Sequence, residues 1–522
     1  MPLLHASNMT FRFANGEVLF ESLSFRLQHR RVGIVGRNGS GKSVLLSLIT
    51  GERSPFAGHI LREGSVAQYR QLPSDLLTND QTIAQFLKLD VVIDALNRVE
   101  NGCCDPADFE AIGEQWLIRE ELAQQLAQLK LPNNPDHLCK HLSGGQLARL
   151  QLWRLFQHPK DLLLLDEPSN HLDSAGKVWL LAEMARYSGV IILVSHDRAL
   201  FKNVDQIWEL SRLGLQQYGG NYDVYRQQKA HETAAVERQL LSIKNQQKQL
   251  ERQAQRDHEK AQRRAAQGVK LRREGSQAKL LLNGMRNSAE RSVGARRTNE
   301  QVRRTMLAEQ ANQVAKQVEQ LKPQSMSLGQ GVASRNTAVS LINAQLPHGS
   351  AEPVHITCSM RKKLHLSGGN GCGKSTLLKV LLGDVELLSG EKRVNVPLFY
   401  LDQHFDRLLP EQTLLDNLSH YCPHLCESEV RTQLAGIGFR RDAVWRLVKD
   451  ISGGEKMKLA MLIVTHQTTR PFLLLDEPDN HLDLDSKLLL ASALNRYQGG
   501  FILVSHDEAF VKECGVDEQY LL

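Results

Sequence analysis

One set of motifs occurs twice along this chain, in the same order and at a nearly constant offset. Each set holds a glycine-rich loop, a Ser-Gly-Gly turn, an apolar run ending in Asp-Glu-Pro and a Val-Ser-His-Asp segment. The two glycine-rich loops run from Gly36 to Ser43 and from Gly368 to Ser375. A whole domain has therefore been duplicated, and the chain is expected to fold as two related halves.

The 522 residues allow two or three domains. We expect an α/β fold in which two phosphate-loop domains are joined by an antiparallel α-helical coiled-coil hairpin. The expected boundaries are 1–222 for the first domain, 223–325 for the hairpin linker and 326–522 for the second domain. Each half is long enough to bury a core of its own.

The linker is rich in good helix formers, and its apolar residues alternate in steps of four and three. This spacing is typical of heptad seams, and the seam residues are Val236, Leu240, Ile243, Leu250 and Ala254, then Leu307, Ala311, Val314, Val318 and Leu321. Glycines appear from Gly268 to Gly294, which places the hairpin tip in that range. Arms of about 35–40 residues would extend about 50–60 Å.

Charge is distributed unevenly along the chain. The formal net charge is +6, yet Asp223 to Lys322 holds 22 Lys and Arg against 11 Asp and Glu. A basic linker between two acidic halves predicts a polyanionic partner. Arginines such as Arg263, Arg264, Arg272 and Arg273, without aromatic residues, favour contact with a phosphate backbone over base stacking. A solvated linker whose charges only maintain solubility is the alternative interpretation.

Several classes of protein are disfavoured by the sequence. No apolar run approaches the length of a membrane span, and the first residues lack the pattern of a signal peptide. The eight cysteines show neither a disulfide framework nor zinc-ligand spacing, which fits a reducing compartment. We therefore expect a soluble, cytoplasmic protein, and a role in transport would require a separate membrane subunit.

The glycine-rich loops have the context that a phosphate-binding loop needs. The first follows the apolar run Val32 to Val35 and opens a helical run at Ser43. Glycines let successive backbone N–H groups turn toward phosphates, and the helix N-terminus adds positive partial charge. Lys42 would reach the β- and γ-phosphates and Ser43 would bind Mg²⁺. Lys374 and Ser375 have the same expected roles in the second half.

Two further motifs complete the predicted site in each half. Asp166 and Asp476 end apolar strands of a parallel sheet, at the edge where ligands bind, and suit Mg²⁺ binding. Glu167 and Glu477 follow directly and are placed to polarise an attacking water. His196 and His506 end another strand, where an imidazole can bond the γ-phosphate. A duplicated histidine at a matching offset favours a nucleotide contact over a structural role.

Together these motifs resemble the ATP-binding cassette superfamily along nearly the whole chain. The resemblance implies that each Ser-Gly-Gly turn contacts the nucleotide held by the other cassette, so that two ATP molecules join the cassettes and hydrolysis releases them. It also implies that Gln71 and Gln403 sense Mg²⁺ and water. The residues assigned to binding are Phe13, Gly36, Asn38, Gly39, Gly41, Lys42, Ser43, Val44, Ser143, Gly144 and Gly145, and then Gly368, Asn370, Gly371, Gly373, Lys374, Ser375, Thr376, Ser452, Gly453 and Gly454.

Finer features resemble the F subfamily, written ABC-F. Glu167 to Asp173 and Glu477 to Asp483 are similar to its Glu-Pro-Thr-Asn-His-Leu-Asp pattern, and Tyr218 to Tyr225 is similar to the segment that leads into its linker. The resemblance implies a translation-associated ATPase with ATP and Mg²⁺ as cofactors. It further implies that the linker is inserted at the ribosomal exit-tRNA site, so that the ribosome and tRNA are the expected partners of a monomer.

Some residues depart from the family pattern. Phe13 sits where the family stacks an aromatic ring on adenine, but no aromatic residue lies between Arg335 and Lys374. Stacking of one base contributes about 1–3 kcal/mol, so the second site is expected to bind ATP more weakly. Glu455 and Asp479 add carboxylates near the phosphates of the second half, which also predicts unequal sites. Gln71 to Leu142 is longer than Gln403 to Ile451, which predicts a small helical insertion.

Three other functions remain open from the sequence alone. Tandem cassettes also occur as energy subunits of importers, although the basic linker argues against that class. A DNA-repair or chromosome ATPase is a second alternative, but in the long-coiled-coil type the coil interrupts a single cassette. A purely structural relative is disfavoured because both glutamates and both histidines are present. The fold by itself does not choose between these functions.

Overall fold

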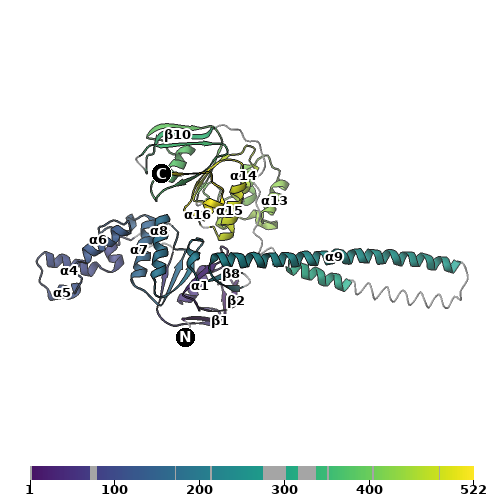
Figure 1. Cartoon of the computed structure of the whole chain (residues 1–522), viewed down its shortest axis with the longest axis horizontal. Helices are drawn as coiled ribbons and strands as arrows, with labels where there is room; N and C mark the ends of the chain where they lie inside the picture. Colours follow the sequence, from purple (N-terminus) through teal and green to yellow (C-terminus); the bar gives the residue numbers. More distant parts are fainter. Residues whose placement is uncertain are drawn as a thin grey trace. The chain divides into compact units, whose positions relative to one another are not determined.

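The computed structural model describes residues 3–70, 79–170, 172–211, 214–273, 301–314, 337–349, 352–402, 405–480 and 482–522. The chain divides into two units. Met1–Asp223 and Gln324–Leu522 form the first unit, which holds both cassettes, and Val224–Pro323 forms the second, which is the linker. Figure 1 shows the chain and labels some of the elements used below.

The first cassette is built on a mixed sheet with the strand order β5-β6-β7-β3-β8-β9. Its first four strands and β8 are parallel, and β9 pairs antiparallel with β8. β6 is four buried leucines followed by Asp166, and β7 is apolar throughout, as expected for strands covered on both faces. The bounds are β3 Arg31–Val35, β5 Val66–Tyr69, β6 Leu162–Asp166, β7 Val190–Val194, β8 Gln206–Ser211 and β9 Gly214–Gly219.

A small antiparallel sheet in the order β2-β1-β4 lies beside the first phosphate loop. Its strands are β1 Leu4–Arg12, β2 Val18–Arg26 and β4 Ala57–Arg62. Inward residues such as Met9 and Phe25 pack against helix α1, Lys42–Thr50, and against the mixed sheet in one apolar cluster. This cluster fixes α1, whose first residue is Lys42, relative to both sheets.

The other helices of the first cassette cover the sheet or extend from it. α7, Gly144–Gln157, packs with α3, Ile83–Leu87, and α6, Ile118–Gln128, in a separate apolar cluster. α4, Asp90–Glu100, and α5, Pro106–Ile112, form a further cluster with Ile118. The extra residues of the first cassette are therefore helical, as predicted. α8, Ser174–Arg186, follows the Asp-Glu-Pro motif.

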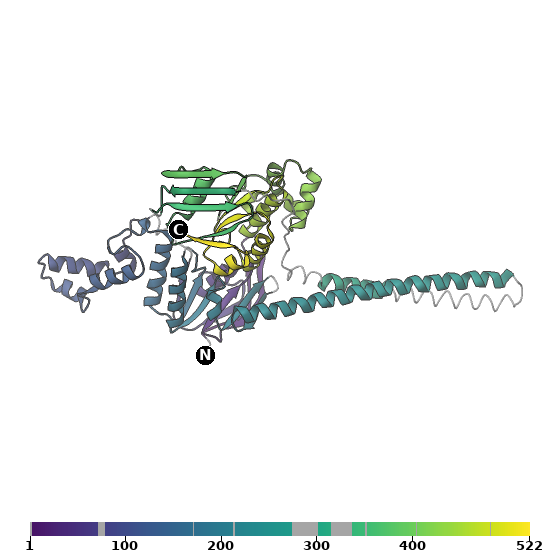
Figure 2. The ribbon, with the colours of Figure 1, turned by 45° about the horizontal axis from the view of Figure 1, so that its top comes forward.

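The second cassette repeats this plan. Its parallel sheet has the order β14-β15-β16-β12-β17, and its antiparallel sheet has the order β11-β10-β13. Figure 2 shows the antiparallel sheet in green above the yellow strands, and one apolar cluster joins the two. The strands are β10 Thr337–Gln345, β11 Val354–Ser359, β12 Lys363–Ser367, β13 Ser389–Val394, β14 Leu398–Leu401, β15 Phe472–Asp476, β16 Phe501–Val504 and β17 Glu518–Leu521.

The helices of the second cassette fill the remaining faces of its sheet. They are α11 Lys374–Leu382, α12 Leu414–Tyr421, α13 Glu427–Gly436, α14 Gly453–His466, α15 Leu484–Arg496 and α16 Glu508–Glu513. The matching order of strands, loops and helices in the two halves confirms the tandem-cassette fold class. No helix in the described part of the chain is long and apolar enough to span a membrane.

The described part of the linker is helical. α9 runs from Tyr222 to Arg273, a length of 52 residues, so at 1.5 Å per residue it extends about 78 Å. The predicted arm of 35–40 residues was therefore too short, because the helix continues through Gly268 without a break. The remaining tip residues, to Gly294, lie outside the described residues.

Residues 301–314 form a second helix that packs against α9. The contact uses Ile243, Leu307 and Val314, with Val236, Leu240 and Ala311 at its margins. The amide of Gln247, which interrupts the apolar seam, donates from Nε2 to the carbonyl of Leu307 at 3.1 Å. The predicted seam residues Val318 and Leu321 lie outside the described residues.

Candidate nucleotide site

Each phosphate loop is a sharp turn between a strand and a helix. Gly41 and Gly373 adopt φ values of 91° and 103°, which a residue with a Cβ rarely adopts, and each directly precedes its helix. The Lys42 ammonium donates to the carbonyls of Gly36 at 2.8 Å and Arg37 at 3.3 Å. Lys374 donates in the same way to Gly368 at 3.0 Å and Gly369 at 2.8 Å. Both lysines therefore lie folded over their own loops.

The strand order gathers the other predicted groups beside the loop. β6, β7 and β3 are neighbours and parallel, so their carboxyl ends share one edge of the sheet. Asp166 ends β6, and Glu167 follows with an unusual φ of 51°, its N–H donating to the carbonyl of Val194. Glu477 repeats this geometry with a φ of 50° and a hydrogen bond to Val504. This shared strain turns both glutamate side chains out of the strand direction.

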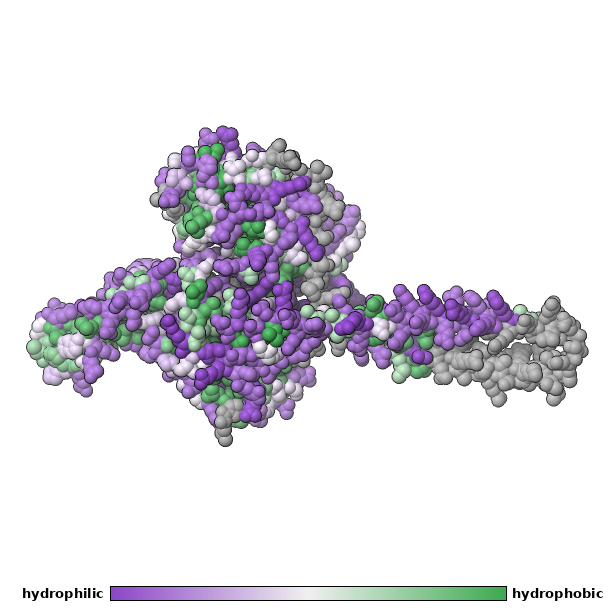
Figure 3. All heavy atoms as spheres, in the orientation of Figure 1, coloured by the Kyte–Doolittle hydropathy of each residue, from purple (hydrophilic) through white to green (hydrophobic). Residues whose placement is uncertain are grey.

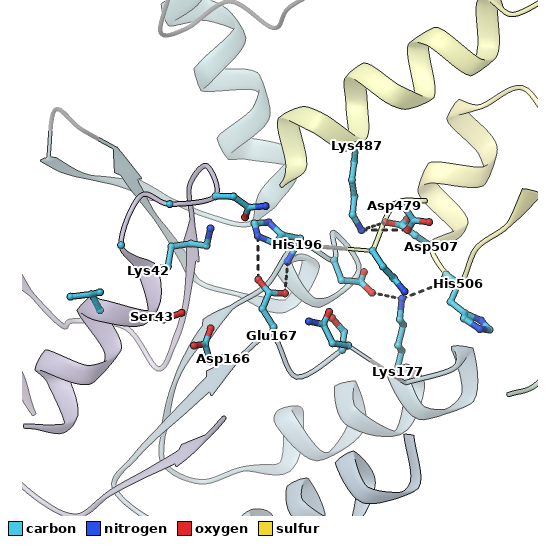
Figure 4. A pocket seen from close by; sticks show the side chains of 18 of the residues that line it. Lys42, Ser43, Asp166, Glu167, Lys177, His196, Asp479, Lys487, His506 and Asp507 are labelled. Atoms are coloured by element: carbon cyan, nitrogen blue, oxygen red, sulfur yellow. Dashed lines mark hydrogen bonds and ion pairs between the residues drawn. The ribbon is translucent and has the colours of Figure 1, made fainter. Parts of the chain in front are cut away.

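The first-cassette groups line one cavity of about 460 Å³. In Figure 4, Lys42, Ser43, Asp166, Glu167 and His196 surround it on one side. Asn38, Gly39, Gly41, Val44 and Phe13 also line the cavity. The structure thus brings the first-cassette loop residues, Asp166, Glu167, His196 and Phe13 around one cavity, while Gly36 contributes through its carbonyl to Lys42.

The cavity holds opposing charges in a largely buried setting. Burial raises the pKa of Glu167 to about 8, although the charge of Lys42 opposes this shift. Burial also raises the pKa of Asp166, against hydrogen bonding from Ser43. The pKa of Lys42 is lowered by burial, which the neighbouring carboxylates partly offset. These groups are arranged to bind a charged ligand, which would replace the water they have lost.

The second site shows the same contacts with different surroundings. Ser375 hydrogen-bonds Asp476, whose Oδ2 also accepts from the Tyr400 hydroxyl at 3.2 Å. Asn370, Gly371, Gly373 and Thr376 belong to the loop and the first turn of α11. Gly368 and His506 line a separate cavity of about 440 Å³ together with Ser174 of the first cassette. Burial lowers the pKa of His506 to about 4, assisted by the charges of Lys374 and Lys177.

The two sites differ at the position of the adenine-stacking ring. Phe13 directly follows β1, is 37 % exposed and lines the first cavity. The residue that directly follows β10 is Leu346, which is 3 % exposed and packs in the core. The next turn also approaches the second loop closely, since a Cβ on Gly349 would lie 2.3 Å from the carbonyl oxygen of Cys372. The second cassette therefore offers no equivalent ring at this position.

Two carboxylates that were expected near the second phosphates have other partners. Glu455 closes a capping box at the start of α14, accepting from the N–H of Ser452 at 2.9 Å. Asp479 lies 3.6 Å from the ammonium of Lys487 and is almost fully buried. The sequence reasoning missed Lys177 and Lys487, although each stands at the same offset after its Asp-Glu-Pro motif.

Each Ser-Gly-Gly turn begins a helix. Ser143 and Ser452 cap α7 and α14, whose first residues are Gly144–Gly145 and Gly453–Gly454. None of these six residues, all in the described part of the chain, lines the cavity around Lys42. That cavity is instead completed by Asp479, Asn480, Lys487, His506 and Asp507 of the second cassette. Contact between each turn and the opposite nucleotide stays a prediction.

Contacts between the cassettes place the start of α15 against the first phosphate loop. The N–H of Asn38 donates to Asp483 at 3.1 Å, and Arg37 pairs with Asp485 at 3.5 Å. A Cβ on Gly454 would lie 2.7 Å from the hydroxyl of Ser486, so the second Ser-Gly-Gly turn is in close contact with the first turn of α15. A third contact joins Arg198 to Glu513 at 2.6 Å.

The donors at the loop are suited to a hard divalent cation. Ser43 with Asp166, and Ser375 with Asp476, each bring a hydroxyl and a carboxylate together, and Mg²⁺ prefers oxygen ligands of this kind. The proposed ligands Gln71 and Gln403 lie outside the described residues. The site residues present therefore fit Mg²⁺ bound together with nucleotide phosphates.

Comparison with known proteins identifies the family. The model of the family described as ABC transporter matches residues 20–170 and 351–480. The Bacillus subtilis ATP-binding protein YdiF is 32% identical over 98% of this chain and 78% of its own length. The Escherichia coli ATP-binding protein Uup is 30% identical over 99% of this chain and 80% of its own. ABC transporter F family member 5 of Arabidopsis thaliana is 28% identical over 92% of this chain and 70% of its own length.

Solved structures share the tandem fold. A protein described as RNase-L Inhibitor covers 99% of this chain and 87% of its own, with a TM-score of 0.53 and 17% identity. A model of ribosome-bound archaeal Pelota and ABCE1 contains a chain with a TM-score of 0.53 and 16% identity, covering 96% of this chain and 74% of its own. With two intact cassettes and these relatives, the chain is an ATP hydrolase that belongs to the F subfamily of the ATP-binding cassette proteins.

Proposed function

We propose that this ATPase acts on the ribosome, binding it in the ATP-bound state and leaving after hydrolysis. The observation that carries the proposal is the joining of two complete cassettes by a long basic helical linker. Importer subunits need a surface for membrane-protein helices, whereas a basic helix suits an RNA backbone. Proteins of similar fold include an archaeal ribosome recycling factor in complex with a ribosomal stalk protein.

Exposed cations on α9 form the proposed RNA contact. Six of them follow one another at intervals of four, four, four, four and three residues, and they are Lys244, Lys248, Arg252, Arg256, Lys260 and Arg263. Residues four apart lie on adjacent turns of a helix, so these side chains make a stripe about 29 Å long. Figure 3 shows that the visible surface of α9 is largely hydrophilic. A stripe of this length can contact several phosphates along an RNA strand.

The stripe begins at Lys244, before the four arginines that the sequence predicted to contact phosphates. Arg263 belongs to the stripe, is exposed, and is one of the arginines that the sequence predicted to contact phosphates. Arg264, Arg272 and Arg273 continue the same helix, but their side chains lie outside the described residues. We propose RNA phosphates, with tRNA at the exit site as the specific target, for this surface in a monomeric, cytoplasmic protein.

In each site we propose the following division of roles. Lys42 and Lys374 bind phosphate oxygens, and Ser43, Asp166, Ser375 and Asp476 hold Mg²⁺ with Gln71 and Gln403. When bound, Mg²⁺ neutralises charge on the phosphates. Glu167 and Glu477 orient the attacking water, while His196 and His506, which lie beside these glutamates, bond the γ-phosphate. Phe13 stacks on the adenine of the first site only, so the two sites differ in affinity.

Cosedimentation with purified ribosomes tests the ribosomal function. The Glu167→Gln/Glu477→Gln double variant should bind ATP without hydrolysing it, so it should pellet with ribosomes only when ATP is present. If that variant binds ATP but does not pellet, the ribosomal function is wrong. Recovery in washed membrane fractions would then point to an importer subunit.

A charge-reversed linker tests the stripe. Lys248→Glu/Arg252→Glu/Arg256→Glu should weaken ribosome binding and reduce its dependence on salt concentration, because fewer counterions are released. The matched control is Lys160→Glu/Lys202→Glu/Arg496→Glu, which makes the same change in net charge on exposed cassette residues. Equal losses in the two proteins would contradict a specific role of α9.

A further inference from the structure

A cluster of buried charges lies between the two cassettes and lines the same cavity as Lys42, but none of its residues was assigned to nucleotide or Mg²⁺ binding from the sequence. It consists of Lys177 and Asp197 of the first cassette with Asp479, Lys487 and Asp507 of the second. Each of these side chains is at most 15% exposed. Asp197 and Asp507 directly follow His196 and His506, so the cluster adjoins both histidine loops. Figure 4 shows both lysines pointing into this region.

The two lysines occupy equivalent positions but make different contacts. Lys177, in the first turn of α8, pairs with Asp197 at 2.7 Å and donates to the backbone carbonyl of His506 at 3.1 Å. Lys487, in the first turn of α15, pairs with Asp507 at 3.1 Å and Asp479 at 3.6 Å. Lys177 therefore crosses to the other cassette, whereas the close partners of Lys487 belong to its own cassette.

One difference between the duplicated motifs accounts for this asymmetry. Cassette 2 has Asp479 at the position that Ser169 occupies in cassette 1. Asp479 offers Lys487 a second carboxylate, while Ser169 pairs with Ser195 through their hydroxyls, 3.3 Å apart. Lys177 pairs with one carboxylate of its own cassette, that of Asp197, so its ammonium still has an N–H group to donate to the carbonyl of His506. A charged donor to a buried carbonyl is among the stronger hydrogen bonds in proteins.

We propose that Lys177 is a positioning residue for the second ATP site, acting from the first cassette through the backbone of His506, and that the Ser169/Asp479 difference makes this link one-way. Lys177 holds the His506 carbonyl while Lys487 holds the adjacent Asp507 carboxylate, so the loop that carries the His506 imidazole is fixed from two sides. When the cassettes separate, the second site loses one of these supports. Hydrolysis there consequently depends on the position of cassette 1.

The test uses proteins in which only the second site can hydrolyse ATP. In the Glu167→Gln background, adding Lys177→Met should lower kcat about tenfold and change KM less than about twofold, because a misplaced group affects the chemical step more than binding. Lys177→Arg keeps a charged donor and should restore at least half of the rate. Lys202→Met is the control, since it removes the same charge from an exposed side chain of cassette 1. The proposal is overturned by an unchanged kcat, by equal losses in Lys177→Met and Lys202→Met, or by a matching rise in KM.

A second variant tests the link without removing the lysine. Ser169→Asp introduces the carboxylate that Asp479 provides in the second cassette. Lys177 should then pair with the introduced carboxylate as well as Asp197 and lose its hydrogen bond to the His506 carbonyl. In the Glu167→Gln background, the kcat of the second site should therefore fall. An unchanged rate would refute the role given to Asp479.

The inference rests on the roles proposed above for Glu167, Glu477 and His506. Full activity in the Glu167→Gln/Glu477→Gln protein would refute those roles and this inference together, whereas an inactive double variant with an unaffected Lys177→Met protein would refute this inference alone.

Discussion

Glu167 and His196 face each other across the ends of β6 and β7, with Oε1 and Nε2 3.3 Å apart. The backbone N–H of His196 also donates to Oε2 of the same carboxylate at 3.3 Å. His196 thus hydrogen-bonds one oxygen of the glutamate through its backbone and lies close to the other, while the backbone of Glu167 has a positive φ. In the second cassette the corresponding distance between His506 and Glu477 is 3.6 Å. The histidine thus lies closer to the glutamate in the first cassette, whereas Glu477 also accepts a hydrogen bond from the side-chain amide of Asn480.

The first prediction concerns these glutamates. Glu167→Gln and Glu477→Gln each keep the shape of the side chain but remove the charge that would orient water. Each should eliminate hydrolysis at its own site, and the double variant should lose about a hundredfold or more of the steady-state ATPase rate. Phosphate release under saturating ATP measures this. A double variant within about threefold of the parent would contradict the assignment.

The second prediction concerns adenine binding. Phe13→Ala should raise KM for ATP about tenfold in the Glu477→Gln protein, where only the first site is active, because stacking on one base is lost. In the Glu167→Gln protein the same change should have no effect. Phe56→Ala is a matched control, since Phe56 is 65% exposed and packs under Arg12 outside the cavity. A similar KM increase in both backgrounds would argue against a site-specific ring.

The third prediction concerns the turn beside the second phosphate loop. Gly349→Ala places a Cβ 2.3 Å from the Cys372 carbonyl at a φ of 114°, which costs about 1–3 kcal/mol or displaces the loop. ATP affinity at the second site should fall, as measured by nucleotide titration in the Glu167→Gln background. Gly436→Ala is the control, because a Cβ there meets no atom within 4 Å. Equal affinity in the two proteins would show that the turn does not shape the site.

The fourth prediction concerns packing in the linker. Ile243→Ala removes a side chain that is 8% exposed and packs with Leu307 and Val314, so it should weaken the pairing of the two helices by about 2 kcal/mol or more. Leu241→Ala, at a position that is 62% exposed, should change stability by less than about 0.5 kcal/mol. Limited proteolysis of the linker should separate the variants, while both keep the parental ATPase rate. Equal cleavage rates of the Ile243→Ala and Leu241→Ala proteins would contradict the packing of Ile243 between the two linker helices.

The fifth prediction concerns pH. His506 has a pKa of about 4 in the folded chain because it is buried, whereas an unfolded histidine titrates near pH 6.5. Between these values the unfolded state binds the extra proton, so stability should increase as pH rises from about 4 to about 6.5. His506→Asn should reduce the change in unfolding free energy across this pH range by up to about 3 kcal/mol. Urea midpoints at several pH values measure it, and identical slopes in the two proteins would contradict the shift.

The sequence by itself determined the duplicated cassette plan and most of the first site. Glycine spacing, apolar strands and the residues that end them have local physical causes, so Lys42, Asp166, Glu167 and His196 could be predicted to meet at one sheet edge. Phe13 could also be assigned, and the absence of a second ring was visible in the composition of the matching segment. The helical linker followed from its heptad spacing and helix-forming residues.

Only the tertiary structure decided which groups meet across the cassettes. Nothing local to Lys177 indicates that its ammonium reaches the carbonyl of His506, because this contact depends on how the two cassettes approach each other. The length of α9 was also underestimated, since glycine lowers helix stability by only about 1 kcal/mol and the helix continues through Gly268. Local chemistry is encoded in the motifs, whereas the coupling between sites arises from side chains at an interface, where partners are distant in sequence.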